Sequence, residues 1–251
     1  MPATHDAQRS PQYVYGVVPA GAAVSVEEAG VGGEAVRLVE DDGVAAVVSA
    51  FAGVDVRLRR RDLLAHLRTL ERVFEQATVA PCPFGTVVGE DVREAFLAPR
   101  REELRRLLQR LEGHAQMNVK VEYEEDTILG EIVAQDRDVA RARERTKALG
   151  SAAYYENIRL GELISARLAE RRAVDAEAIH ARLSALAAEA APEAVEGELL
   201  VYKGSFLVAR TRLEEFDAAT EALVAGRPGR MRFDVIGPLP PAAFATLEAA
   251  G

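Results

Sequence analysis

The only cysteine of this 251-residue chain, Cys82, lies between two prolines in the segment 81–88. A thiolate held on such a rigid turn could act as a nucleophile, but a reactive cysteine needs a partly exposed, electropositive setting or a nearby base. Its neighbours Pro81, Pro83 and Phe84 supply no base. Because unpaired cysteines are among the most often buried residues, we predict that Cys82 has a structural role.

The four histidines give no second pattern for catalysis or metal binding. His5, His66, His114 and His180 lie far apart, and no two of them have the one-turn spacing of helical metal ligands. His66 falls at the edge of a predicted apolar helix face, where a packed core neighbour is a better interpretation than a general base. The chain also lacks a glycine-rich phosphate loop followed by Lys and Ser or Thr. We therefore expect no enzyme activity, no cofactor and no metal site.

The composition argues against several classes of partner. A formal net charge of −9, an aromatic content of 6% and the absence of tryptophan do not suit a nucleic-acid-binding protein. A single cysteine allows no internal disulfide, which fits a reducing compartment. No apolar run approaches the roughly 20 residues of a membrane span, and residues 1–11 lack the features of a signal peptide. We expect a cytoplasmic protein that binds neither nucleic acid nor lipid membranes, with residues 1–11 as a disordered lead-in.

Residues 12–114 predict an N-terminal α+β domain. The run 13–18 is almost continuously apolar, which is typical of a central strand that is covered on both faces. Between two later β-rich runs, the step Asp42-Gly43 predicts a hairpin, because glycine accepts the positive φ of a tight turn. A hard-cation loop would need more oxygen ligands than residues 40–42 offer.

A helix over residues 62–77 is predicted from apolar residues at three- or four-residue spacing. That spacing places Leu63, Leu67 and Leu70 on one buried face. Two shorter helical patterns follow, and Gly113 ends the second of them as a helix C-terminal glycine would. We place the domain boundary there.

The segment 81–88 is interpreted as a structural crossing from that helix to a strand. Phe84 should anchor the crossing in the core, where replacing a fully buried Phe by Ala costs ~3–5 kcal/mol. Gly85 allows a sharp turn, and Thr86 begins the return to a β pattern. These three residues are therefore candidates for structural or interaction roles.

Residues 115–237 predict the element order β–helical region–β–β–α–β. Residues 118–124 alternate polar and apolar side chains, which indicates a half-buried strand. A helical region follows over about 127–190, and two β-rich runs flanking Lys203-Gly204 predict a hairpin. This is the order of a ferredoxin-like (βαββαβ) domain with extra helices in its first crossover. The fold class is thus α+β, with two domains.

The helical region should consist of several pieces. Breaks are expected at Gly150-Ser151 and within residues 172–175. After Gly237, residues 238–251 form a C-terminal tail that begins with a proline-rich run.

Six short features resemble, in their order, the GvpL/GvpF family of gas vesicle proteins. They are Tyr13-Val14-Tyr15-Gly16, Pro83-Phe84-Gly85-Thr86-Val87, Val119-Lys120-Val121, Ile158-Arg159-Leu160-Gly161-Glu162-Leu163, Phe206-Leu207-Val208 and Gly237-Pro238-Leu239-Pro240-Pro241. Each feature is weak by itself, but together they cover almost the whole chain. From these features, Leu160, Gly161, Gly237, Pro238 and Pro240 join the candidates for structural or interaction roles.

The resemblance implies a non-enzymatic role in gas vesicle assembly. The partners that it implies are the small, hydrophobic wall protein of the vesicle and other gas vesicle accessory proteins, in a cytoplasm that contains gas vesicles. It also implies two α+β domains, the second a modified ferredoxin-like domain, with the tail 238–251 packed between them. The chain departs from the pattern at Ala242-Ala243-Phe244, where relatives often carry an aromatic or hydroxyl residue after the prolines.

Two other functions stay open from the residues alone. A ferredoxin-like domain can serve as a regulatory domain that binds a small molecule, although fold by itself is weak evidence for function. An enzyme built around Cys82 would have a thiol that alkylates quickly at neutral pH. For a binding protein, the extra helices over residues 138–190 are the first region expected to contact a partner, because a simple ferredoxin-like domain does not need them. The alternative for those helices is a solvated elaboration with no partner.

Overall fold

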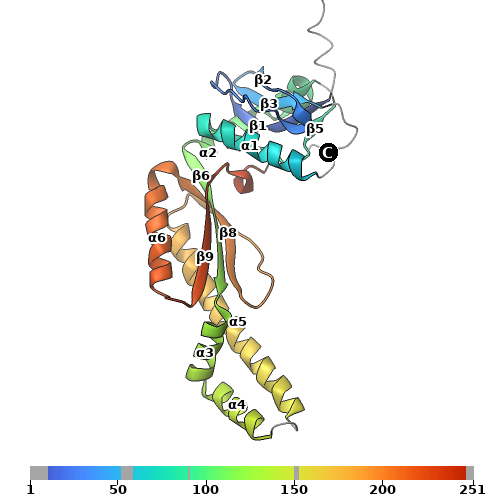
Figure 1. Cartoon of the computed structure of the whole chain (residues 1–251). Coiled ribbons are helices and arrows are strands. Elements are labelled where there is room, and N and C mark those ends of the chain that lie inside the picture. The colour runs from blue at the N-terminus through green and yellow to red at the C-terminus, as the bar shows by residue number, and fades with distance from the viewer. Residues whose placement is uncertain (1–10, 52–58, 90, 150–152, 247–251) are drawn as a thin grey trace, which may run out of the picture. The chain divides into compact units, whose positions relative to one another are not determined.

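The computed structural model describes residues 11–51, 59–89, 91–149 and 153–246 (Figure 1). The chain forms two compact units, a first unit of residues 1–116 with 238–251 and a second unit of residues 117–237. A five-stranded sheet lies in one unit and a four-stranded sheet in the other, so the fold is α+β as predicted. Most of the expected lead-in lies outside the described residues.

The sheet of the first unit has β1 at its centre. Its strand order is β2-β3-β1-β4, and the short β5 also pairs with β1. The strands are β1 (Gln12–Pro19), β2 (Val36–Asp41), β3 (Val44–Ala50), β4 (Ala80–Pro81) and β5 (Val87–Val88). Every residue of β1 before Pro19 is buried, which confirms the prediction of a strand covered on both faces.

Two helices cover opposite faces of this sheet. They are α1 (Arg60–Gln76) and α2 (Arg101–Leu111), and α2 follows irregular helical turns over Arg93–Leu97 and Ala98–Arg100. Tyr13 contacts α1 through a hydrogen bond to His66. Asp41 lies on the other face of the sheet and pairs with Arg101 of α2 at 2.6 Å.

The buried face of α1 differs from the predicted one. His66, Leu70, Val73 and Phe74 are buried, whereas Leu63 and Leu67 are 37% and 45% exposed. The helix carries more apolar positions than one face can bury, and spacing alone does not decide which stripe faces the sheet. The structure places His66 in the buried stripe, as the packed neighbour that the sequence analysis favoured.

The hairpin between β2 and β3 is confirmed. Asp42 and Gly43 form its turn with φ of 30° and 87°, the left-handed backbone that a two-residue hairpin turn requires. Asp42 pairs with Arg105 of α2 at 3.1 Å. The acidic residues here are thus partners of arginines at a turn.

The second unit contains a four-stranded sheet, and two of its helices, α5 and α6, cover one face of that sheet (Figure 1). Its elements are β6 (His114–Tyr123), α3 (Glu125–Gln135), α4 (Arg137–Leu149), α5 (Tyr154–Ser184), β7 (Glu189–Pro192), β8 (Leu200–Ala209), α6 (Leu213–Ala225) and β9 (Met231–Leu239). The strand order is β7-β8-β6-β9, and the types of element follow one another as predicted, with three helices in the first crossover, although two of the strands consist of other residues than predicted. Val119, Val121 and Tyr123 of β6 face the core formed with α5 and α6, as their alternation predicted.

The predicted hairpin at Lys203-Gly204 is wrong. β8 runs through both residues without a turn, and its hairpin partner is β7, which lies at the end of the predicted helical region. A Cβ on Gly204 would lie 2.8 Å from the hydroxyl of Tyr202 and 3.1 Å from the carbonyl oxygen of Ala191. Glycine is needed here for the close approach of two strands, and not for a turn.

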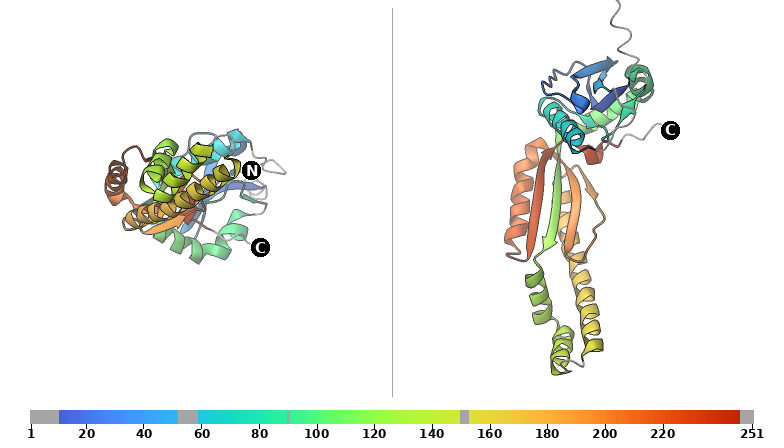
Figure 2. Two further views of the ribbon diagram at one scale, coloured as in Figure 1. Left: turned by 90° about the horizontal axis from the view of Figure 1, so that it is seen from below. Right: turned by 45° about the vertical axis from the view of Figure 1, so that its right-hand side comes forward.

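The helical region also breaks at a different place. α5 is continuous through residues 172–175, where a break was predicted. The observed break lies at Asp136, whose Oδ1 accepts hydrogen bonds from the N–H groups of Asp138 and Val139 and so caps the start of α4. The break expected at Gly150-Ser151 lies outside the described residues. Figure 2 shows α3, α4 and the start of α5 extending past the end of the sheet.

Candidate partner-binding surface

Cys82 lies in the core of the first unit. Its side chain is 4% exposed, and burial raises the pKa of the thiol to about 12. Its backbone N–H donates to the carbonyl oxygen of Tyr15 at 2.8 Å, which continues the pairing of β4 with β1. A neutral, buried thiol supports the structural interpretation.

Alkylation of Cys82 by iodoacetamide should be at least ~100-fold slower in the folded protein than in urea, at the same mildly alkaline pH. The raised pKa lowers the thiolate fraction, and burial blocks access. The rate can be followed by mass spectrometry. Equal rates in the two states would return Cys82 to the candidates for a reactive nucleophile.

The rest of the crossing segment is held by contacts within the first unit. Phe84 is only half buried, with its ring centroid 5.6 Å from that of His66, so the loss expected for a fully buried Phe is too large for this site. Gly85 has a φ of 96°, and its N–H donates to the Tyr13 hydroxyl at 3.0 Å. The Thr86 hydroxyl donates to the carbonyl oxygen of Pro83 at 2.7 Å.

His66 sits in an aromatic cluster rather than in a catalytic arrangement. Its ring stacks on Tyr15 with centroids 5.7 Å apart, and its Nδ1 lies 3.0 Å from the Tyr13 hydroxyl. Burial lowers the pKa of His66 to about 4 and raises that of Tyr13 to about 12. The ring is 3% exposed, so it has no surface to offer a substrate.

The other predicted residues are spread along the two units. Leu160 and Gly161 lie on α5, with Leu160 packed against the core of the second unit and Gly161 exposed. Gly237 and Pro238 are exposed at the end of β9, and Pro240 is half buried. These positions bring no reactive groups together.

The C-terminal tail makes hydrogen bonds within the first unit. The N–H of Ala243 donates to the Gln116 side chain at 2.8 Å, and Arg110 of α2 donates to the carbonyl oxygen of Phe244 at 2.6 Å. The Phe244 side chain is 5% exposed. The expected position of the tail between the domains stays a prediction.

A buried carboxylate that the sequence analysis missed lies in the second unit. Asp175 of α5 is 6% exposed, and it accepts hydrogen bonds from Tyr123 at 2.6 Å and Arg230 at 2.7 Å. Burial, followed by the contact with Asp175, raises the pKa of Tyr123. The spacing of the residues could have indicated this carboxylate, because Leu168, Asp175 and Ile179 fall on one stripe of the helix. A carboxylate on a buried stripe needs a buried partner.

Large apolar side chains are exposed where α4 and α5 meet, which we call the helical tip (residues 137–149 and 153–163). Tyr154 and Tyr155 are 69% and 77% exposed, and their rings lie edge to face with centroids 5.4 Å apart. Leu149 and Ile158 are 49% and 44% exposed. The tip thus offers aromatic and aliphatic side chains to a partner.

The helical tip is also basic, in contrast to the chain as a whole. The tip carries six basic residues, of which Arg137, Arg141, Arg143, Arg145 and Lys147 lie on α4 and Arg159 on α5, against the four acidic residues Asp138, Glu144, Glu156 and Glu162. A cavity of about 730 Å³ lies between α4 and α5, lined by Asp138, Ala140, Arg141, Ala142, Glu144, Arg145, Glu156, Arg159 and Leu163. Arg145 and Arg159 form no ion pair with any described carboxylate, so they can meet acidic groups of a partner.

The described residues contain no cluster of three or more His, Cys, Asp or Glu side chains suited to a metal ion. In the same part of the chain, no helix combines the length and apolar character that a membrane span requires.

Comparison with known proteins gives consistent results. The model of the family described as "Gas vesicle synthesis protein GvpL/GvpF" matches residues 11–246. "Gas vesicle protein F" of a Streptomyces species is 32% identical over 236 residues, which cover 92% of this chain and 98% of that protein. The protein of the same name from Dolichospermum flosaquae is 24% identical over 242 residues, covering 95% and 98% of the two chains.

Two crystal structures share the fold. The gas vesicle protein GvpF of an Anabaena species superposes with a TM-score of 0.83 at 24% identity, covering 96% of this chain and all of that one. GvpF of Microcystis aeruginosa gives a TM-score of 0.73 at 23% identity, covering 94% and 99%. The likeness extends over both compact units.

Proposed function

Because the chain belongs to the GvpL/GvpF family of gas vesicle synthesis proteins, we propose that it is a non-enzymatic accessory protein of gas vesicle assembly. In this role it binds the hydrophobic wall protein and other gas vesicle proteins in the cytoplasm, in association with the vesicles. The family match over residues 11–246 includes both units and supports a role of the whole chain rather than of one part. The resemblance noted in the sequence is thereby confirmed.

The exposure of Tyr154 and Tyr155 is the observation that favours the helical tip as the binding surface. Both side chains remain more than two-thirds exposed, at 69% and 77%, and therefore stabilise the isolated unit little. Tyrosine and arginine are enriched among the residues that dominate the energy of protein interfaces. A wall protein that exposes apolar surface before incorporation would bury that surface against the tyrosines.

The charge of the tip supports the same proposal. Partners that present apolar side chains bordered by carboxylates would meet the tyrosines at the centre and arginines such as Arg145 and Arg159 at the rim. The acidic remainder of the chain would keep such a complex soluble.

Replacing both Tyr154 and Tyr155 by serine should weaken binding of purified wall protein by about 10–100-fold, as loss of two aromatic anchors does. Binding can be measured by pull-down and by surface plasmon resonance. Because both side chains are exposed, the thermal stability of the double variant should equal that of the wild type.

Val174→Ser provides a matched control, because Val174 lies on the same helix and is 71% exposed. This variant should bind as the wild type does. Equal binding by the double tyrosine variant would remove the tip from the proposal. A failure of the wild-type chain to bind wall protein would overturn the proposed function itself.

A further inference from the structure

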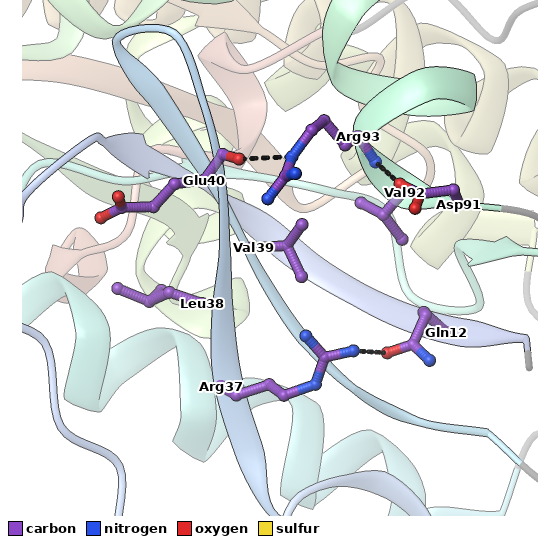
Figure 3. Close-up of a pocket in the computed structure, with 8 residues that line it drawn as sticks. All are labelled: Gln12, Arg37, Leu38, Val39, Glu40, Asp91, Val92 and Arg93. Carbon is purple, nitrogen blue, oxygen red and sulfur yellow. Dashed lines mark hydrogen bonds between the residues drawn. The ribbon is translucent and has the colours of Figure 1, made fainter. Parts of the chain in front are cut away.

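A pocket in the first unit contains two arginine side chains, Arg37 and Arg93 (Figure 3). Its volume is about 430 Å³, and its lining residues are Gln12, Arg37, Leu38, Val39, Glu40, Asp91, Val92 and Arg93. Figure 3 shows both arginine side chains on the same side of β2, with Val39 and Val92 between them. The pocket therefore has a guanidinium group at each end and apolar side chains between them.

Neither arginine forms an ion pair with a described carboxylate. Arg37 donates from Nη2 to the amide oxygen of Gln12 at 2.7 Å, and Arg93 donates from Nε to the carbonyl oxygen of Glu40 at 2.8 Å. Each guanidinium has five N–H donors, so these neutral acceptors leave several donors free. The planar fork of a guanidinium matches the two oxygens of a carboxylate or phosphate.

The nearby carboxylates are mostly engaged elsewhere. Glu40 extends its side chain to the other side of β2, where an oxygen accepts from the N–H of Gly21 at 3.1 Å. Asp41 is paired with Arg101 at 2.6 Å. Asp91 lines the pocket, and its Oδ1 accepts from the backbone N–H of Arg93 at 2.8 Å. Among the described residues that line the pocket, two guanidinium groups face the carboxylate of Asp91, while that of Glu40 points away, so these residues give the pocket an excess of positive charge.

We propose that this pocket binds the carboxylate or phosphate group of a small organic anion between Arg37 and Arg93, with Val39 and Val92 contacting the apolar part of the ligand. The proposal is independent of the role of the helical tip. The same anionic group can belong to a free small molecule or to an acidic side chain of a protein partner. The experiment therefore includes both kinds of probe.

The full chain should be titrated at constant ionic strength with citrate, with pyrophosphate and with an acetylated, amidated Glu-Val-Glu peptide. We expect saturable binding of at least one probe by isothermal titration calorimetry, with a matching rise in Tm. Arg37→Gln and Arg93→Gln should each weaken that binding at least about tenfold, because each removes charge-assisted hydrogen bonds to the anion. Arg37→Lys should bind at an intermediate level, because it keeps the charge and loses the fork.

Arg68→Gln is the matched control, since Arg68 is an exposed arginine of α1 outside the pocket. It should bind each probe as the wild type does. Binding of citrate or pyrophosphate would assign the site to a free anion, and binding of the peptide alone would assign it to a protein partner. Equal weakening by all three Gln variants, or no saturable binding of any probe to the wild-type chain, would overturn the proposal.

Discussion

Replacing Asp175 by alanine should lower the free energy of unfolding of the second unit by about 2–4 kcal/mol, because it removes a buried acceptor from the Tyr123 hydroxyl and from two partly buried arginines. Arg230 donates to this carboxylate at 2.7 Å and Arg227 lies 3.6 Å from it, so that Arg230 would keep only its longer contact with Glu131 at 3.5 Å. Tyr123, whose hydroxyl lies 2.6 Å from Asp175, would lose a second buried hydrogen bond. Urea unfolding followed by far-UV circular dichroism measures the loss.

Two further variants test the cause of that loss. Asp234→Ala removes a carboxylate whose side chain is 50% exposed and lies 3.9 Å from Arg232, so it should cost less than about 1 kcal/mol. Replacing Asp175 by leucine and Arg230 by methionine together should cost less than Asp175→Ala, because Arg230 is then removed with its partner and only Arg227, which is 23% exposed, loses the carboxylate. If Asp175→Ala lowers the free energy of unfolding no more than Asp234→Ala does, the contacts of Asp175 contribute little to stability.

Acidification should destabilise the first unit through His66. The folded pKa is about 4 and the unfolded value is near 6.5, so the unfolded state binds more protons between these two values. Stability from this group is therefore complete above about pH 6.5, declines as the pH falls through that window, and changes no further below about pH 4. The expected loss is about 2 kcal/mol between pH 7.5 and pH 5.

The contribution of His66 can be separated from that of other groups by His66→Phe, which keeps an aromatic ring beside Tyr15 and cannot be protonated. The difference in unfolding free energy between wild type and variant should shrink toward acid by the same ~2 kcal/mol. The ring proton signals of His66 in NMR spectra should begin to shift only below about pH 5. Titration near pH 6.5, or parallel acid losses in both proteins, would contradict the burial argument.

Short-range chemistry made parts of this fold predictable from the sequence. The Asp42-Gly43 turn was predicted correctly because two positive φ angles are a local requirement, which aspartate and glycine meet by themselves. The strand 118–124 was predicted because its polar and apolar side chains alternate, as they do in a strand with one buried face. Both features are determined within a few neighbouring residues.

The failures have a common cause, which is that distant residues decide the outcome. Gly204 has the appearance of a turn glycine, yet its role depends on Ala191 of the neighbouring strand. Asp175 has the appearance of a helix breaker, yet its carboxylate is held by Tyr123 and Arg230, some 50 residues away in each direction. Tertiary contacts of this kind override local propensity.

The candidate surface was predictable only as a region. The helices that a simple ferredoxin-like domain lacks indicated where a partner-binding surface was expected, and the helical tip belongs to these helices. Ile158 has the spacing of a core residue with Leu168 of the same helix, yet it is 44% exposed about one turn after Tyr154 and Tyr155. A pattern of apolar residues cannot tell a face that packs on the core from one that is left for a partner.

The strands at the margins of the two sheets are poorly suited to polymerisation. β4 has two residues and ends in Pro81, β7 has four and ends in Pro192, and β9 carries Pro238 near its end. On β2, the Arg93 side chain donates a hydrogen bond to the carbonyl oxygen of Glu40, which an added strand would otherwise use. Short strands, prolines and charged side chains discourage strands of other chains from adding to a sheet. In the proposed role, such a protein can work beside an aggregation-prone wall protein without seeding amyloid-like growth.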